Sequence, residues 1–192
     1  MSLDAFLAST DVIDWKSSDV VALANDLRGS SSDNSEIAKA AFEWVRDEIK
    51  HTVDYGLNPV TCKASDVLRQ RTGFCYAKSH LLAALLRAND IPAGFCYQRL
   101  SMDGEGAPFC LHGLNAVLLP DHGWYRIDAR GNKPGVNAVF DPPHEHLAFE
   151  TALPGERTIP GIRPEPLESV VEALRCHKTC DELCKNLPDT EP

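Results

Sequence analysis

Three residues of the types used in thiol catalysis occur along the chain in the order Cys75, His112 and Asp128. Cys75 follows Thr72-Gly73, which breaks a short helical segment, and it begins the most apolar helical run of the chain. We expect Cys75 in the first turn of that helix, where unpaired N–H groups and the helix dipole favour a thiolate. The same N–H groups can bind the oxyanion of a tetrahedral intermediate. The alternative is a buried structural cysteine, the commonest role of a free cysteine.

A thiol nucleophile needs a base, and the base needs an acceptor that orients it. His112 begins one strand-like segment and Asp128 ends the next, and the turn residues at 120–123 predict a hairpin between them. If 119–123 form a five-residue loop, Asp128 pairs with Leu114 and shares a face with His112, about 7–8 Å away at Cα. A four-residue loop would instead turn the two side chains to opposite faces unless a bulge corrects the register. The alternative to a catalytic pair is a hairpin end with an exposed histidine and aspartate.

The remaining pattern predicts helices first and strands second. Helical spacing or capping residues predict helices over 19–28, 35–50, 65–69 and 74–88, and alternation predicts strands over 94–100, 112–119 and 124–128. This order indicates an α+β domain with an antiparallel sheet. The helix at 74–88 is apolar over most of its circumference, so we expect it at the centre of the fold.

The C-terminal part of the chain has a different composition. Residues 131–166 are rich in Pro and Gly, which predicts an extended wrap with little regular structure, and 167–187 predicts a last helix. We therefore expect one domain over residues 1–165, with a C-terminal helix in residues 166–192 docked on it. Cys176, Cys180 and Cys184 would form one stripe on that helix. We interpret the stripe as packing against the domain; metal ligation is the alternative.

Composition excludes several partners. The net charge of −9 and the pI of about 5.2 argue against nucleic acid, because phosphate binding needs clustered Lys and Arg. No apolar run approaches the ~20 residues of a membrane helix, so we expect no membrane association. The N-terminus lacks the basic region of a secretory signal, and the number of cysteines is odd, at seven. Reduced thiols in the cytoplasm are the simplest interpretation.

Three blocks of sequence resemble the transglutaminase-like superfamily, in the order and spacing of that family. They are the segments 73–79 (GFCYAKS), 112–117 (HGLNAV) and 124–128 (WYRID), each with one of the three candidate residues. The segment 64–68 (ASDVL) is also similar to the family, and 128–133 (DARGNK) is similar to its small bacterial members. The resemblance covers roughly residues 35–150. One departure is Leu114, where many members carry an aromatic residue two positions after the histidine.

The resemblance implies a papain-like α+β core, with a central catalytic helix packed on an antiparallel sheet. It also implies Cys75 as nucleophile, His112 as base and Asp128 as its orienting acceptor. Such enzymes cleave or transfer amide bonds through a thioester, so the expected substrate is a peptide, an isopeptide or a small amide. We expect no metal and no other cofactor. The sequence does not determine the acyl acceptor or the oligomeric state.

A second oxyanion donor is harder to assign. Tyr55 and Asn58 lie in the irregular segment before the catalytic helix, and Gln98 lies in a predicted strand, so these three are weak candidates for oxyanion or substrate binding. Two other hypotheses compete with the enzyme. One is a non-catalytic protein that keeps the fold, and the other is a metal-binding protein that uses the same three residues or the C-terminal cysteines as ligands.

Overall fold

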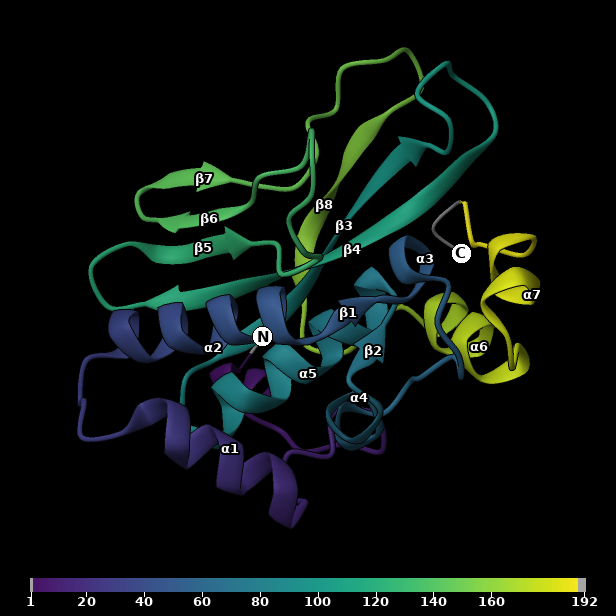
Figure 1. The fold of residues 1–192 in the computed structure, drawn as a ribbon. Helices are drawn as coiled ribbons and strands as arrows, with labels where there is room; N and C mark the ends of the chain where they lie inside the picture. The colour runs from purple at the N-terminus through teal and green to yellow at the C-terminus, as the bar shows by residue number, and fades with distance from the viewer. Residues whose placement is uncertain (1, 190–192) are drawn as a thin grey trace.

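The computed structural model describes residues 2–189, in which helices cover a four-stranded antiparallel sheet (Figure 1). The helices are the 3₁₀ helix η1 (Leu3–Phe6) and the α-helices α1 (Ser18–Arg28), α2 (Asn34–Glu48), α3 (Thr52–Tyr55), α4 (Ala64–Gln70), α5 (Cys75–Ala88), α6 (Glu168–Cys176) and α7 (Cys180–Cys184). The strands are β1 (Lys50–His51), β2 (Thr72–Gly73), β3 (Ala93–Ser101), β4 (Phe109–Leu119), β5 (Gly123–Ile127), β6 (Val139–Asp141), β7 (His144–His146) and β8 (Arg157–Arg163). The predicted α+β class is confirmed.

Helix α5 lies at the centre of the molecule, as its apolar circumference predicts. All of its residues from Cys75 to Arg87 are buried, and it packs against α1, α2 and α4 on one side and against β3 and β4 on the other (Figure 1). Its two buried cations are satisfied by backbone carbonyls. Lys78 donates to the carbonyls of Arg46 and Ile49 at the end of α2, and Arg87 donates to the carbonyls of Ala8, Ala93 and Pro164. These bonds offset the cost of burying charge and tie α5 to distant segments.

The main sheet has the strand order β5-β4-β3-β8. Strands β4 and β5 form the predicted hairpin, with Leu119 opposite Gly123 and Asn115 opposite Ile127. This is the register of the five-residue loop, and its continuation sets Asp128 level with Leu114. The alternative register, with a four-residue loop, is therefore excluded.

Strand β8 corrects the expectation of an irregular wrap over 131–166. Its residues Arg157–Ile159 pair antiparallel with β3, and a register shift follows between Phe95 and Tyr97. β8 contains Pro160 and Gly161, which conceal it in the sequence. An edge strand tolerates both residues, because one side of its backbone forms no ladder. The short pair β6–β7 adds a second hairpin in the same stretch, beside β5 (Figure 1).

The expected helix over 167–187 is also wrong, because it is divided into α6 and α7. Thr179 restarts the chain with a capping box, in which its side chain accepts from the Glu182 N–H and Glu182 bonds back to the cap. The break removes the expected cysteine stripe: Cys176 is exposed, whereas Cys180 is buried. Leu174 and Leu183, from the two helices, join the main hydrophobic core. The division into residues 1–165 and 166–192 stays a prediction.

Candidate active site

A short parallel pair of strands positions the start of α5. β1 pairs with β2, with His51 opposite Gly73, and the chain leaves β2 through Phe74 directly into the helix. Phe74 is the N-cap residue in extended conformation, so Cys75 is the first helical residue. Cys75 is 8% exposed. The thiol therefore lies at a helix N-terminus with free N–H groups, as the sequence predicts.

Gly113 allows β4 to approach the first turn of this helix. A Cβ atom at Gly113 would lie 2.9 Å from Cδ1 of Tyr76 and 3.4 Å from its Cα. The Tyr76 hydroxyl donates to the carbonyl of Leu111, so the same tyrosine binds the strand on both sides of His112. A side chain at position 113 would push the strand away. Glycine at this position therefore sets the distance between His112 and Cys75.

His112 and Asp128 form a buried pair. The His112 Nε2 atom and the Asp128 Oδ2 atom are 2.7 Å apart, and the two residues are 5% and 1% exposed. Asp128 also accepts from the N–H groups of Arg130 and Ala148, both at 3.1 Å. Because three donors surround the carboxylate, it stays ionised and orients the imidazole. Nδ1 is the ring nitrogen that remains for Cys75.

The electrostatics of the pair favour a charged imidazole. Burial by itself would lower the pKa of His112, but the charges and hydrogen bonds of Asp128 and Cys75 outweigh it and raise the pKa to about 10. Burial opposes ionisation of Asp128, yet His112 and the two N–H groups lower its pKa below the usual value. The arrangement therefore stabilises an imidazolium at His112 beside the ionised Asp128 carboxylate.

An aromatic wall stands beside His112 despite the leucine at position 114. Phe149 meets the His112 ring edge to face, with ring centroids 5.1 Å apart and an interplanar angle of 88°. Gln98 holds this loop, because its Nε2 atom donates to the Phe149 carbonyl at 3.1 Å. The Arg130 guanidinium lies over the Phe149 ring, 5.6 Å from its centroid. The wall thus comes from a loop 37 residues after His112 and not from the strand itself.

A cavity of about 500 Å³ opens at Cys75 and His112. Its walls come from β1 and α3, from the ends of β3 and β4, from the loops after β5 and β7, and from α7. The residues lining it are mostly apolar, and its polar groups include His51, Ser101, Arg130, Lys133, Glu150 and Glu156. Such a mixture suits a substrate with an apolar body and a few fixed polar contacts.

His51 is the polar residue beside Cys75 that the sequence did not indicate. Its ring is buried and packs on Phe74, with centroids 5.9 Å apart. Its Nδ1 atom has no hydrogen bond to any described residue and lies 3.8 Å from Oδ2 of Asp54. Burial and the neighbouring Arg130 hold the pKa of His51 well below its usual value, so the ring is neutral. Only its position beside Gly73, which depends on a two-residue strand, brings it to the site.

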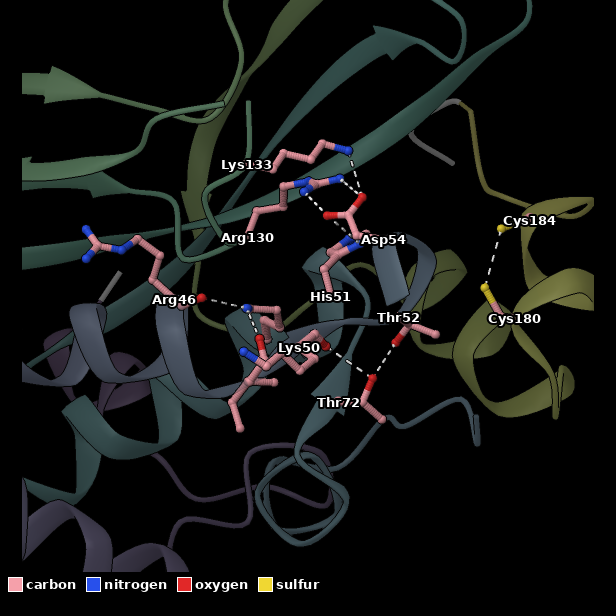
Figure 2. A network of polar contacts seen from close by, with 12 residues as sticks. Arg46, Lys50, His51, Thr52, Asp54, Thr72, Arg130, Lys133, Cys180 and Cys184 are labelled. Atoms are coloured by element: carbon pink, nitrogen blue, oxygen red, sulfur yellow. Dashed lines mark hydrogen bonds and ion pairs between the residues drawn. The ribbon is translucent and has the colours of Figure 1, made fainter. Parts of the chain in front are cut away.

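A charged cluster forms one rim of the cavity (Figure 2). Asp54 accepts from both terminal nitrogens of Arg130 and, at 2.7 Å, from Lys133. These contacts lower the pKa of Asp54 to about 2, although burial opposes that shift. Asp54 belongs to α3, whereas Arg130 and Lys133 follow Asp128 in the chain. The cluster therefore fixes the loop that begins at the Asp128 carboxylate.

The three weak oxyanion candidates lie outside the lining of this cavity. Tyr55 is exposed and stacks with Lys50. Asn58 accepts from the N–H of Cys180 at 2.8 Å and so holds the start of α7. Gln98 lies directly across from His112 on β3, but its amide supports the Phe149 loop. Each has a structural contact, and the geometry brings none of them to the thiol.

Two of the other cysteines share the cavity with Cys75. Cys110 and Cys184 line the cavity with Cys75, and burial and the nearby Cys75 raise the pKa of Cys110 to about 12. Sγ of Cys180 lies 3.9 Å from Sγ of Cys184 (Figure 2). Within residues 2–189, no three His, Cys, Asp or Glu side chains form a group that could hold a metal ion. No helix in that range is long and apolar enough to span a membrane.

The fold and the placement of a buried cysteine at the head of the central helix define a papain-like α+β protein. The chain belongs to the transglutaminase-like superfamily, because the model of that family matches residues 21–129. A search of curated proteins found no match.

Solved structures that are similar to this chain include two proteins, of which the first shares its fold. One is described as a "Putative Cysteine Protease from Cytophaga hutchinsonii"; it is 22% identical, with a TM-score of 0.54, and the match covers 67% of this chain and 42% of that one. Another is the periplasmic domain of TgpA from Pseudomonas aeruginosa, which is 24% identical with a TM-score of 0.43 over 57% of this chain and 41% of that one. This chain thus spans about two fifths of the length of both.

Proposed function

We propose that the protein is a cysteine-nucleophile hydrolase or acyltransferase that acts on an amide bond. The observation that carries the proposal is the position of His112, which contacts both the Asp128 carboxylate and the Cys75 side chain at the edge of an open cavity. A metal-binding or purely structural protein has no need of a charged imidazole at a helix N-terminus. The cavity suits a peptide or a small amide.

In the proposed reaction, the Cys75 thiolate attacks the carbonyl carbon and forms a C–S bond. The tetrahedral intermediate expels the amine as the C–N bond breaks, and the imidazolium of His112 gives its proton to the leaving nitrogen. A water molecule or a second amine then attacks the thioester, gives a proton back to His112 and releases the thiolate. Asp128 stays ionised throughout and holds the ring in one tautomer.

Two donors are proposed for the oxyanion. One is the N–H of Cys75 at the helix N-terminus. The other is the neutral ring of His51, which is buried beside Phe74 in the wall of the same cavity. A neutral donor adds no net charge to a site that already holds an imidazolium. His51 thus takes the role that the sequence left to Tyr55, Asn58 or Gln98.

The proposal is tested with a panel of peptides, isopeptides and small amides, with and without an added primary amine. Cleavage that Cys75→Ala abolishes while the circular dichroism spectrum is unchanged supports it. A mass increase of the protein equal to the acyl group, removed by hydroxylamine, identifies the thioester. Stoichiometric metal in the purified protein, with loss on chelation of whatever activity is found, would favour the metal-binding alternative. With the added amine present, a product that contains the amine indicates acyl transfer, and the free acid indicates hydrolysis.

The cytoplasm stays the proposed compartment, on the argument from cysteine content. Fractionation of the source cells, with an antibody against the protein, tests it. Recovery with the periplasm or the culture medium would contradict it.

A further inference from the structure

The edge of β4 next to His112 lacks a strand partner over half its length. β5 pairs only with Asn115–Leu119, so among the described residues no strand pairs with 109–114 on that side. Leu111 lies in this part, one residue before His112. Its carbonyl accepts from Tyr76, and its N–H is bound by another segment of the chain. An unpaired strand edge beside a nucleophile is a place where an extended peptide can bind through its backbone.

The segment that binds Leu111 is Leu187–Asp189. It follows α7, has no regular secondary structure, and places the carbonyl of Pro188 2.7 Å from the Leu111 nitrogen. Leu187 lines the cavity together with Cys75 and His112. This short segment therefore lies where a peptide ligand of the β4 edge would lie.

The Arg99 guanidinium is held in position to bind the carboxylate of this segment. Its Nε and Nη2 atoms donate to the two oxygens of Asp189, at 2.5 and 2.8 Å. The guanidinium is held independently, because Nη1 donates to the Gly155 carbonyl at 2.7 Å and the group lies over the Phe109 ring at 3.8 Å. A guanidinium held in one orientation can donate two parallel hydrogen bonds to a carboxylate, which makes it a specific carboxylate-binding group.

The segment is held more weakly than the helix before it. Its polar contacts are one backbone hydrogen bond and one ion pair, the Asp189 side chain is 39% exposed, and Leu187 packs on the core only partly buried. Together these contacts stabilise the segment less than full burial of a leucine stabilises α7. By contrast, α7 is anchored by the fully buried Leu183 and by a capping box. The segment can therefore leave the β4 edge without unfolding the helix.

We propose that Leu111 and Arg99 form a binding subsite for an extended acidic peptide, and that Leu187–Asp189 occupies it as an intramolecular ligand in the free protein. The ligand presents a backbone carbonyl to the Leu111 N–H, and the next residue is Asp or Glu, whose carboxylate pairs with Arg99. This inference rests on the proposed function and narrows its substrate class to peptides with an acidic residue near the reacting amide.

The test is a titration followed by ¹H–¹⁵N NMR, with Cys75→Ala in every protein so that no reaction occurs. The probe is acetyl-Asn-Leu-Pro-Asp-amide, which reproduces residues 186–189. The signals are the Leu111 amide and the Arg99 Nε–H. Asp189→Lys frees the subsite by repulsion from Arg99. Glu172→Lys makes the same charge change at an exposed position on α6 and serves as the control.

In Asp189→Lys, both signals should shift saturably as the probe is added, and the probe should bind about tenfold more tightly than in the Glu172→Lys control. The reason is that, in the control, Leu187–Asp189 occupies most of the subsite, so the apparent affinity for the probe is reduced by the fraction of molecules whose subsite is free. The probe with Asn in place of Asp should bind severalfold more weakly, and Arg99→Gln in the Asp189→Lys protein should remove that difference. Equal affinities in Asp189→Lys and Glu172→Lys, or no shift of Leu111, would overturn the proposal. Because the titration needs no thiol, it can succeed even if Cys75 proves unreactive, so the two proposals fail separately.

Discussion

The chemistry proposed for Cys75 depends on the protonation state of His112. Its partners are both acidic groups: Asp128 at 2.7 Å and the thiol of Cys75. Because they raise the pKa of His112 to about 10, the ring carries a proton over the whole neutral range. In the proposed reaction, this proton is the one that His112 gives to the leaving amine.

The first prediction concerns thiol reactivity. With limiting iodoacetamide at pH 6 to 7, Cys75 should be alkylated before the other six cysteines, because the helix N-terminus and the imidazolium favour its thiolate. His112→Ala should slow this labelling, and Asp128→Asn should slow it less, since the imidazole remains. Mass spectrometry of the digested protein gives the order. A Cys75 rate equal to that of the exposed Cys176, with no effect of His112→Ala, would show that Cys75 is not activated.

The second prediction concerns Gly113. Alanine would put a Cβ atom 2.9 Å from the Tyr76 ring, so the strand and helix must separate. We expect a loss of about 1–3 kcal/mol in the free energy of unfolding, as for other overpacked sites. Cys75 labelling should slow as well, because His112 moves with the strand. Urea unfolding and the alkylation rate measure the two effects. If both stay at the wild-type value, the close approach of β4 is not what sets the distance between His112 and Cys75.

At the scale of elements, the site depends on short segments that long helices and strands hold in place. β1 and β2 are two residues each, yet they set His51 beside the start of α5. The hydroxyls of Thr52 and Thr72 reinforce this pair, with their oxygens 3.2 Å apart (Figure 2). α3 then supplies Asp54, which fixes the loop after β5. Two residues that line the cavity, His51 and Asp54, therefore come from elements of four residues or fewer.

The third prediction tests this loop. Asp54→Asn leaves Arg130, a mostly buried cation, without its anion, so we expect a loss of about 1–3 kcal/mol in the free energy of unfolding. Asp66→Asn is the matched control, because Asp66 pairs with Arg69 on an open helix surface. That change should stay within about 0.5 kcal/mol. Chemical denaturation compares the two variants, and similar losses would mean that the cluster contributes no more than a surface ion pair.

At the scale of the whole molecule, buried neutral histidines make the fold sensitive to acid. Burial lowers the pKa of His80 to about 4 and holds the pKa of His51 well below 6.5. Between about pH 6.5 and 4 the unfolded chain therefore binds protons that the folded chain does not, and stability falls as the pH falls. His112 adds no slope there, because a group with a raised pKa is protonated in both states below about pH 6.5.

The fourth prediction follows from this balance. His80 contributes a loss on the order of 3 kcal/mol by pH 4, and His51 adds to it. His80→Asn removes a titrating group and can keep the donation to the Cys62 carbonyl that the ring makes at 2.8 Å. Urea unfolding at pH 7 and pH 4.5 should show a smaller difference for this variant than for the wild type. If the difference in stability between pH 7 and pH 4.5 is the same as in the wild type, protonation of His80 does not cause the acid sensitivity.

Much of the fold follows from pattern, and the reasons differ by element. Helix α5 is apolar over most of its circumference, which favoured a central position for it. The turn residues at 120–123 predicted the hairpin of β4 and β5, and of the two registers that the sequence left open the structure has the one with Asp128 level with Leu114. Both features are local in sequence. The fold class was therefore predictable, the family was predicted from the three sequence blocks that resemble it, and the comparison with known proteins confirms both.

The features that the sequence did not predict arise from long-range contacts. β8 becomes a strand because it pairs with β3, in spite of Pro160 and Gly161. His51 and Phe149 reach the site through a two-residue strand and an irregular loop, neither of which has a periodic pattern. The capping box formed by Thr179 and Glu182 begins a second helix, which the prediction of a single helix over 167–187 did not include. The catalytic roles of Cys75, His112 and Asp128 stay predictions.

The complete burial of α5 has a consequence for how relatives of this protein diverge. A substitution in that helix disturbs the core and the position of Cys75 together, so we expect few changes there. The cavity walls at 100–104, 149–156 and 184–187 are mostly loop residues that can vary without loss of the core. New substrate preferences should therefore arise by insertion and replacement in these three segments, while the helix that bears Cys75 is inherited almost unaltered.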